Sequence, residues 1–283
     1  MPERRSSPTV GRRRLGIELR RLREQAGFTI EFVAERLECS SSKISRIETG
    51  HIGASPRDVR DILALYGIEG DAAEEWLTVA RDARQKGWWQ AYGAVLRGAY
   101  VAFESATSRI RTFEAQVIPG LLQIPEYATA VFTAARPNIT KELLSLRLEV
   151  RGHRQSLLIR EHPVDLWVIL DEAVFRRMVG GPEVMAAQLA RLLELAQEPH
   201  ITVQVLPASA GAHAGMEGSF SILEYDKRVG SDVVFAENAV GGLFLEKDED
   251  LEHYRTIFGL MSGTALSAER SLDVISARAK ELQ

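Results

Sequence analysis

The sequence predicts an all-α helix-turn-helix domain of five helices at the N-terminus, followed by a larger α+β domain. Three observations lead to this fold class. Between residues 12 and 84, apolar residues recur at helical spacing and no strand-like stretch occurs. From residue 108 on, segments rich in Val, Ile and Phe alternate with further helical segments. At 45% hydrophobic composition the chain can bury a sizeable core, and its 283 residues suggest one large or two modest domains.

The N-terminal domain is expected to consist of five short helices with recognisable start and stop signals. Thr29, Ser40 and Ser55 are good N-cap residues for the second, third and fourth helices. Gly27 and Gly50 follow the first and third helices as stops. The expected helices span residues 12–26, 29–37, 40–48, 55–66 and 71–85.

The larger domain is expected to mix strands and helices, which is typical of the α+β class. The expected strands span residues 108–118, 164–170, 201–206, 219–224, 232–237 and 242–245. The expected helices span residues 125–135, 141–160, 182–197, 248–261 and 267–282. We therefore divide the chain into a disordered basic arm (residues 1–11), the helix-turn-helix domain (12–84) and the α+β domain (85–283).

Charge is divided unevenly along the chain. The whole chain has 35 basic and 39 acidic side chains, a net charge of −4. Residues 1–66 hold 13 basic and 9 acidic side chains, so this end has a net charge of +4. The remainder holds 22 basic and 30 acidic side chains, a net charge of −8. A basic end on an acidic chain raises the question of what that end binds.

Composition also excludes several classes of protein. The single cysteine, Cys39, excludes a disulfide framework and a Cys-rich zinc site, and it fits a reducing cytosol. The longest stretch without charged residues, 199–216, contains two Pro and two Gly and is not a membrane span. No apolar segment follows the basic N-terminus, so a signal peptide is not expected. We expect a cytoplasmic protein without metal or cofactor.

The most informative stretch is residues 29–50, T-I-E-F-V-A-E-R-L-E-C-S-S-S-K-I-S-R-I-E-T-G. It reads as two short helices joined by a three-residue turn, with Leu37, Ile44 and Ile47 forming a shared core. The second helix begins with three serines and a lysine, which place short donors and a cation at an exposed helix N-terminus. Such a helix end suits a DNA major groove and its phosphates. The alternative is a helical hairpin of the kind found in any helical domain.

This segment resembles the helix-turn-helix of phage-repressor-like (xenobiotic-response-element type) regulators, whose recognition helix is written S-x-S-x-I-S-R-I-E-x-G. The resemblance implies double-stranded DNA as a partner and a homodimer that binds two half-sites. By position, Ser41 and Ser42 would face base edges, and Lys43 and Arg46 would reach bases or backbone. Thr29 would cap its helix and hydrogen-bond a phosphate. The DNA-binding candidates are Thr29, Ser40, Ser41, Ser42, Lys43, Ser45 and Arg46.

Each cation in this motif also has a structural interpretation. An ion pair with a nearby Glu is the alternative for Arg46, and plain solvation is the alternative for Lys43. The resemblance places Arg23 in a buried structural ion pair with Glu48, and breaking such a pair costs about 3–5 kcal/mol.

Two positions depart from the family pattern. Glu38 stands where the turn usually has Gly, so it must adopt a left-handed backbone at a cost of about 1–2 kcal/mol, or the turn must differ. Ile30 stands where the family often has Gln, so one polar contact near the DNA backbone is lost.

A basic arm leads into the first helix, which is expected to begin at Arg12. It comprises Arg4 and Arg5, followed by Arg12, Arg13 and Arg14. Such an arm can lie along phosphates or enter a minor groove, and the alternative is a solvated tail.

The larger domain carries its own distinctive string, V-I-P-G-L-L-Q-I-P-E-Y-A at residues 117–128. With this string, several shorter ones resemble the WhiJ-like actinobacterial regulators, often described as antitoxin-like. The shorter strings are G-W-W (87–89), R-Q (154–155), D-E (171–172), Q-L (188–189), V-L-P (205–207) and A-L-S (265–267). The resemblance implies a transcriptional regulator that often works with a small protein partner encoded nearby. Trp88 and Trp89 are either a stacking platform or the buried junction between domains.

Candidate ligand or partner residues in this domain are Arg147, Arg151, Arg154 and His213. The three arginines are spaced to share one helix face, where they would bind an anion or an acidic partner, or pair with the domain's own carboxylates. His213 lies in a Gly- and Ala-rich loop that would close over a ligand, or it is an exposed loop histidine. No H-E-x-x-H, G-x-S-x-G or G-x-x-x-x-G-K-[ST] motif is present. We therefore expect no enzyme, but a DNA-binding regulator, repressor in type. It is controlled by a protein partner or, alternatively, by a small ligand; an enzyme tethered to DNA is the third hypothesis.

Overall fold

The structure is a computed structural model that describes residues 10–82, 92, 100–225, 232–238 and 241–282. The chain divides into two compact units, which we describe separately. The helical unit comprises Met1–Gly93, Arg97–Ala106 and Tyr225–Ser231, and the sheet unit comprises Ala94–Leu96, Thr107–Glu224 and Asp232–Gln283. The expected boundary between residues 84 and 85 lies outside the described residues, as do Arg4, Arg5, Trp88 and Trp89.

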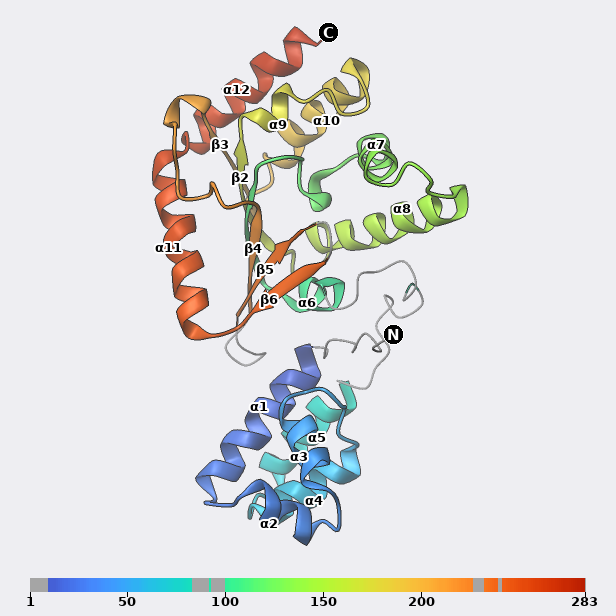
Figure 1. The fold of residues 1–283 in the computed structure, drawn as a ribbon, viewed down its shortest axis with the longest axis vertical. Coiled ribbons are helices and arrows are strands. Elements are labelled where there is room, and N and C mark those ends of the chain that lie inside the picture. Colours follow the sequence, from blue (N-terminus) through green and yellow to red (C-terminus); the bar gives the residue numbers. More distant parts are fainter. Residues whose placement is uncertain (1–9, 83–91, 93–99, 226–231, 239–240, 283) are drawn as a thin grey trace. The chain divides into compact units, whose positions relative to one another are not determined.

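The helical unit contains the five expected helices and one more (Figure 1). They are α1 (Val10–Gln25), α2 (Ile30–Arg36), α3 (Ser41–Glu48), α4 (Pro56–Leu65), α5 (Asp71–Asp82) and α6 (Tyr100–Ala106). We did not predict α6, because its seven residues make only two turns and give too short a pattern of apolar spacing.

The first helix begins two residues earlier than expected. Helix α1 begins at Val10, inside the expected arm, and it includes Arg12, Arg13 and Arg14. Packing explains the early start, because the guanidinium of Arg13 lies 5.1 Å from the centre of the Phe103 ring. Burial lowers the pKa of Arg13 to about 10. Arg13 is therefore packed within the helical unit.

Helices α1 and α3 pack closely at Gly16. A Cβ atom at this position would lie 2.5 Å from the carbonyl oxygens of Ile47 and Glu48, so only glycine allows the contact. The surrounding core is apolar, and its buried members are Leu15, Leu19, Ile47, Ala54, Val59, Ile62, Leu63, Leu77 and Ala80. The end of α3 is thus fixed against the rest of the helical unit.

The sheet unit is built on one six-stranded mixed sheet with the strand order β3-β2-β1-β4-β5-β6. The strands are β1 (Arg109–Glu114), β2 (Asp165–Asp171), β3 (Ile201–Leu206), β4 (Phe220–Glu224), β5 (Val233–Glu237) and β6 (Gly242–Leu245). Strands β1, β2 and β3 are parallel, whereas β4, β5 and β6 continue the sheet in antiparallel pairs. The predicted strand over residues 108–118 is too long, because β4 begins at Phe220 and leaves residues beyond Glu114 without a paired strand.

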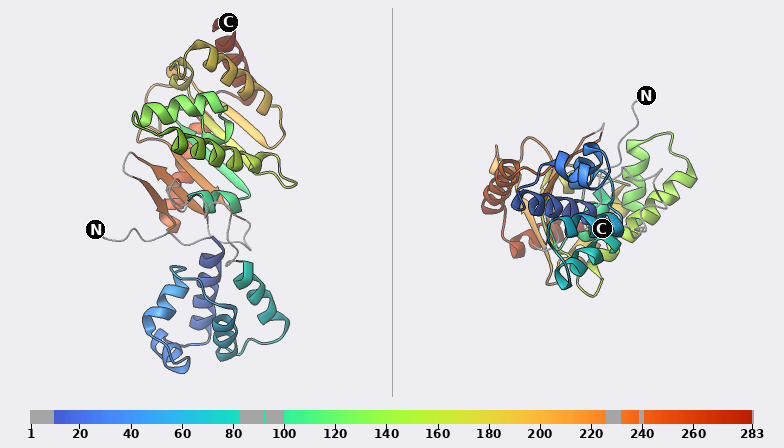
Figure 2. Two further views of the ribbon diagram at one scale, coloured as in Figure 1. Left: turned by 90° about the vertical axis from the view of Figure 1, so that its right-hand side faces the viewer. Right: turned by 90° about the horizontal axis from the view of Figure 1, so that it is seen from below.

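Helices cover both faces of this sheet (Figures 1 and 2). Helices α7 (Pro125–Ala135), α8 (Lys141–Gln155) and α10 (Pro182–Leu195) lie on one face, and α11 (Asp248–Thr264) lies on the other. The short α9 (Ala173–Arg176) follows β2, and α12 (Ala268–Glu281) packs on β3 and α10. The expected helix over residues 141–160 ends at Gln155 and tightens into a 3₁₀ turn, Ser156–Leu158.

The core under α11 contains buried Phe113, Ile169, Phe220, Phe258 and Met261. This layered arrangement of helices and a mixed sheet confirms the expected α+β class of the larger domain.

Candidate nucleic-acid interface

Side-chain caps begin both helices of the motif. The Thr29 hydroxyl oxygen accepts a hydrogen bond from the Phe32 amide at 3.1 Å, at the start of α2. The Ser40 hydroxyl oxygen accepts one from the Lys43 amide at 3.1 Å, at the start of α3. Both side chains accept hydrogen bonds from amides that would otherwise lack a partner at the helix N-terminus. Thr29 and Ser40 are both exposed, so they also lie where a DNA phosphate could approach.

The turn between the helices follows a Schellman pattern. The Cys39 amide donates to the Ala34 carbonyl at 2.9 Å, and the Glu38 amide donates to the Glu35 carbonyl at 3.2 Å. This pattern requires a left-handed residue, and Glu38 has a φ of +50°. The structure thus keeps the family's turn and places a strained non-glycine residue in it.

Helix α3 has a buried side and an exposed side. Its buried side packs against α1 and α2, since α3 contacts both helices. Its other residues are half-buried or exposed, and Arg46 is among the exposed ones. The buried residues are Ile44, Ile47 and Glu48, and those with accessible surface are Ser41, Ser42, Lys43, Ser45 and Arg46.

A bidentate ion pair joins α1 to the end of α3. Arg23 Nε lies 2.7 Å from Glu48 Oε1, and Arg23 Nη2 lies 3.0 Å from Glu48 Oε2. The side chains are only 9% and 4% exposed, and Arg23 Nη1 also donates to the Phe28 carbonyl at 2.8 Å. Hydrogen bonding to Glu48 raises the pKa of Arg23. A pair so well shielded from water orients α3 and takes no part in surface binding.

Lys43 has a partner that the sequence did not indicate. Its ammonium lies 2.7 Å from Asp58 Oδ1, on α4. Asp58 Oδ2 accepts hydrogen bonds from the Ser55 amide at 3.0 Å and the Ser55 hydroxyl at 2.7 Å, which completes a capping box for α4. Lys43 is therefore ion-paired rather than freely solvated, although 41% of its side chain remains exposed. The S-x-x-D spacing of Ser55 and Asp58 is the only sequence signal that could have drawn attention to Asp58.

Arg46 differs from Lys43. It is exposed, and within the described part of the chain its side chain makes no ion pair and no hydrogen bond, so the alternative of an ion pair with a nearby Glu does not hold. Another exposed cation, Arg36 of α2, lies over the Phe32 ring at 5.3 Å, and Phe32 in turn stacks on Phe28 at 4.7 Å. Sequence reasoning did not single out Arg36.

In the sheet unit, the arginines on α8 lie against an aromatic ring. The guanidinium carbons of Arg147 and Arg151 are 5.6 Å and 5.0 Å from the centre of the Phe132 ring. Arg151 also crosses Gly120 so closely that a Cβ atom at Gly120 would collide with the guanidinium. Arg151 and Arg154 both act electrostatically on Glu114, whose pKa burial raises to about 7. The expected anion-binding face is thus partly used by the unit's own carboxylate.

Glutamine side chains hold the P-G-L-L-Q string in place. Gln188 Nε2 donates to the Leu122 carbonyl, and Gln188 Oε1 accepts from the Ile124 amide, both at 2.8 Å. Gln155 Nε2 donates to the Gln123 carbonyl at 2.6 Å. The short Q-L and R-Q strings therefore support this loop, and no sequence pattern had assigned them a role.

His213 is not an exposed loop histidine. Its side chain is 11% exposed, and its Nδ1 accepts a hydrogen bond from the Gly215 amide at 3.1 Å. Its Nε2 lies 3.8 Å from Asp171 Oδ2, and its ring meets Phe113 edge-on at 5.8 Å. The hydrogen bond at Nδ1 and the ring contact with Phe113 therefore anchor His213 in its loop.

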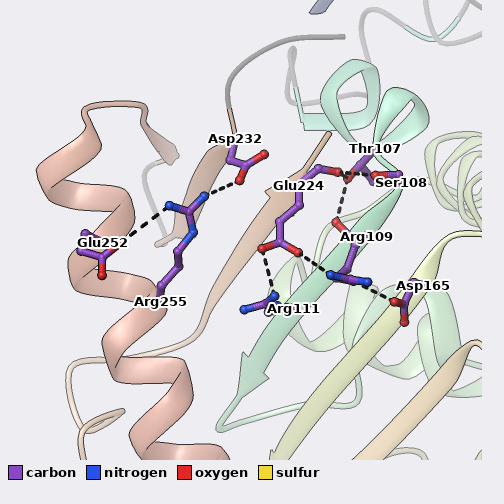
Figure 3. Close-up of polar contacts among 9 residues, drawn as sticks. All are labelled: Thr107, Ser108, Arg109, Arg111, Asp165, Glu224, Asp232, Glu252 and Arg255. Atoms are coloured by element: carbon purple, nitrogen blue, oxygen red, sulfur yellow. Dashed lines mark hydrogen bonds and ion pairs between the residues drawn. The ribbon is translucent and has the colours of Figure 1, made fainter. Parts of the chain in front are cut away.

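An ion cluster at the starts of β1 and β2 was also missed (Figure 3). Arg109 lies 2.7 Å from Asp165 and 3.7 Å from Glu224, and Arg111 lies 3.3 Å from Glu224. Burial raises the pKa of Glu224, although the two arginines oppose this shift. Arg255 of α11 pairs with Asp232 beside them. The cluster ties β1, β2 and β4 together, and its charges are matched internally.

Comparison with protein families adds to this geometry. Residues 14–76 match a helix-turn-helix domain family, and residues 97–277 match a domain of unknown function, DUF5753. The second match covers more than half of the chain. The chain belongs to the DUF5753 family. No curated protein and no solved structure matches it. A helix-turn-helix domain in front of DUF5753 supports a DNA-binding regulator, in line with the expectation from residues 29–50.

Among the described residues, no helix has the length and apolar character needed to cross a bilayer. No group of three or more His, Cys, Asp or Glu side chains among them is arranged to hold a metal ion.

Proposed function

We propose that this DUF5753 protein is a sequence-specific DNA-binding transcriptional regulator, repressor in type, rather than an enzyme. The observation that carries the proposal is the two-sidedness of α3. Its buried side is fixed by Gly16 and by the Arg23–Glu48 ion pair, while Ser42 and Arg46 are exposed. A rigid helix with short donors at its N-terminus and a cation one turn later suits base-edge and phosphate contacts in a major groove.

The test replaces Ser41, Ser42 and Arg46 with Ala in the full chain. We expect specific footprints on genomic DNA to disappear while the thermal unfolding curve stays within experimental error of wild type, because none of these side chains is buried. Arg81→Ala is the matched control, since Arg81 lies on α5 and pairs with Glu74 at 2.8 Å on the surface. Footprints that persist in the triple variant would show that α3 is not the reading helix.

We further propose that the protein acts as a homodimer in the cytoplasm. Regulators of this type bind two half-sites about one helical turn apart, so that one α3 contributes from each protomer. Sedimentation velocity of the full chain, at the concentrations used for DNA binding, should give the mass of two chains. A monomeric mass for the DNA-bound protein would contradict the proposal.

The sheet unit is proposed to receive the regulatory signal. The finer resemblance to WhiJ-like actinobacterial regulators favours a small protein partner encoded nearby, in antitoxin fashion. The stacking of Arg147 and Arg151 on Phe132 favours an acidic partner surface or an anionic ligand as the alternative. Affinity purification of the full chain with its neighbour-encoded proteins separates the two, because only the first predicts a stoichiometric small protein.

A further inference from the structure

The two cations of α3 are held in different ways. Arg46 is exposed and has no ion pair in the described part of the chain. Lys43 forms an ion pair with α4, because its ammonium lies 2.7 Å from Asp58 Oδ1. The ion pair borders a hollow between the α2–α3 turn and α4, whose lining includes Leu37, Ile44 and Ile62.

Hydrogen bonds hold the Asp58 carboxylate in place beside the Lys43 ammonium. Asp58 cannot rotate freely, because its other oxygen accepts two hydrogen bonds from Ser55. Burial alone would favour the neutral carboxyl, but the hydrogen bonds from Lys43 and Ser55 outweigh it and hold the pKa of Asp58 at about 2. The same contact raises the pKa of Lys43. Both groups are therefore charged at every pH at which DNA binding is measured, and their charges cancel locally.

We propose that Asp58 is a specificity-determining residue, which withholds Lys43 from non-specific contact with DNA phosphates. This inference rests on the proposed function, namely that α3 binds DNA. Non-specific affinity comes from cations that displace counterions from the phosphates, whereas specificity comes from base contacts. A cation already matched by a fixed carboxylate adds little to non-specific binding. Asp58 thus lowers affinity for random DNA without removing any group that reads bases.

Salt dependence on a random-sequence duplex measures the effect. Each phosphate neutralised steepens the plot of log affinity against log salt by about 0.9, which is about a 3-fold additional loss of affinity between 50 and 200 mM salt. We expect Asp58→Asn to steepen this slope by about one contact. Asn keeps a side-chain oxygen that can accept from the Ser55 amide, so α4 retains a cap.

The matched control is Asp61→Asn. Asp61 lies one turn later on the same helix, is half exposed and contacts Arg57 rather than Lys43, with 4.0 Å between their charged atoms. It removes the same charge without releasing Lys43, and its contact with Arg57 is weak because the Arg57 side chain is 89% exposed. We expect its slope to equal that of wild type. An Asp58→Asn slope no steeper than that of Asp61→Asn would overturn the inference.

A second pair of variants needs no change at the α4 cap. Lys43→Met should leave the non-specific slope unchanged, whereas Arg46→Met should reduce it by about 0.9. Asp58→Asn combined with Lys43→Met should behave like Lys43→Met alone. Equal losses of slope from Lys43→Met and Arg46→Met would refute the withholding of Lys43. If the wild-type chain binds no duplex at any salt concentration, the proposed function itself fails, and that result is distinct from these.

Discussion

Glu38→Gly is the substitution for which the structure gives the clearest prediction. Glu38 has a φ of +50° in the turn between α2 and α3, and a residue with a Cβ atom pays about 1–2 kcal/mol for the left-handed backbone. Glycine avoids this cost but loses about 0.5–1 kcal/mol more backbone entropy on folding. The net stabilisation should therefore be about 0.5–1 kcal/mol, which corresponds to about 2–8 °C in the Tm of a unit of this size.

Calorimetry of the full chain would measure the Tm. Hydrogen exchange would show whether the added protection is centred on the Cys39 amide, which closes the turn by bonding to the Ala34 carbonyl. Glu38→Ala is the control, because it removes the carboxylate but keeps the Cβ atom. We expect it to leave stability near wild type. Equal stabilisation by Ala and Gly would mean that charge, and not backbone strain, limits the turn, and a destabilised Gly variant would refute the reasoning outright.

Three further predictions concern an ion pair, a close backbone contact and a shifted pKa. Glu48→Gln should destabilise the helical unit by about 3–5 kcal/mol in urea unfolding, whereas the exposed Glu24→Gln should leave the unfolding curve close to that of wild type; similar losses would contradict the burial argument. Gly120→Ala should cost about 1–3 kcal/mol by displacing a guanidinium, whereas Gly152→Ala on α8, where a Cβ meets nothing, should be neutral or stabilising. The folded-state pKa of Glu114 is raised to about 7, so the free energy of unfolding should fall as pH rises from about 4.5 to 7. Glu114→Gln should flatten that fall in a pH series of unfolding curves, and an unchanged profile would contradict the assignment of the fall to Glu114.

The parts of the fold that follow local rules could be predicted from the sequence. Thr29, Ser40 and Ser55 mark the starts of α2, α3 and α4, because a capping side chain bonds to an amide only three residues away. Strands of the α+β unit were also recognisable from their composition. Their order in the sheet was not predicted, because it depends on the crossovers between strands.

Contacts between distant residues escaped prediction for a related reason. Lys43 meets Asp58 across 15 positions, and only the packing of α3 beside α4 brings them together. Nothing local in the sequence indicates the contact between Arg13 and Phe103 either, because the two residues lie 90 positions apart. Sequence charge alone therefore overestimates how many cations near the motif are available to bind DNA.

The net charge of +4 over residues 1–66 is consequently a poor measure of the DNA-facing charge. Arg23 and Lys43 are matched by Glu48 and Asp58, and Arg20 pairs with Glu24 at 2.8 Å. Arg46 is exposed without an ion pair in the described part of the chain. A cation that is already matched by a carboxylate releases few counterions, so these ion pairs weaken the binding of one protomer to random DNA. Useful affinity must then come from base contacts and from two protomers that bind the same duplex together. A second α3 doubles the number of base contacts without raising the charge of either protomer.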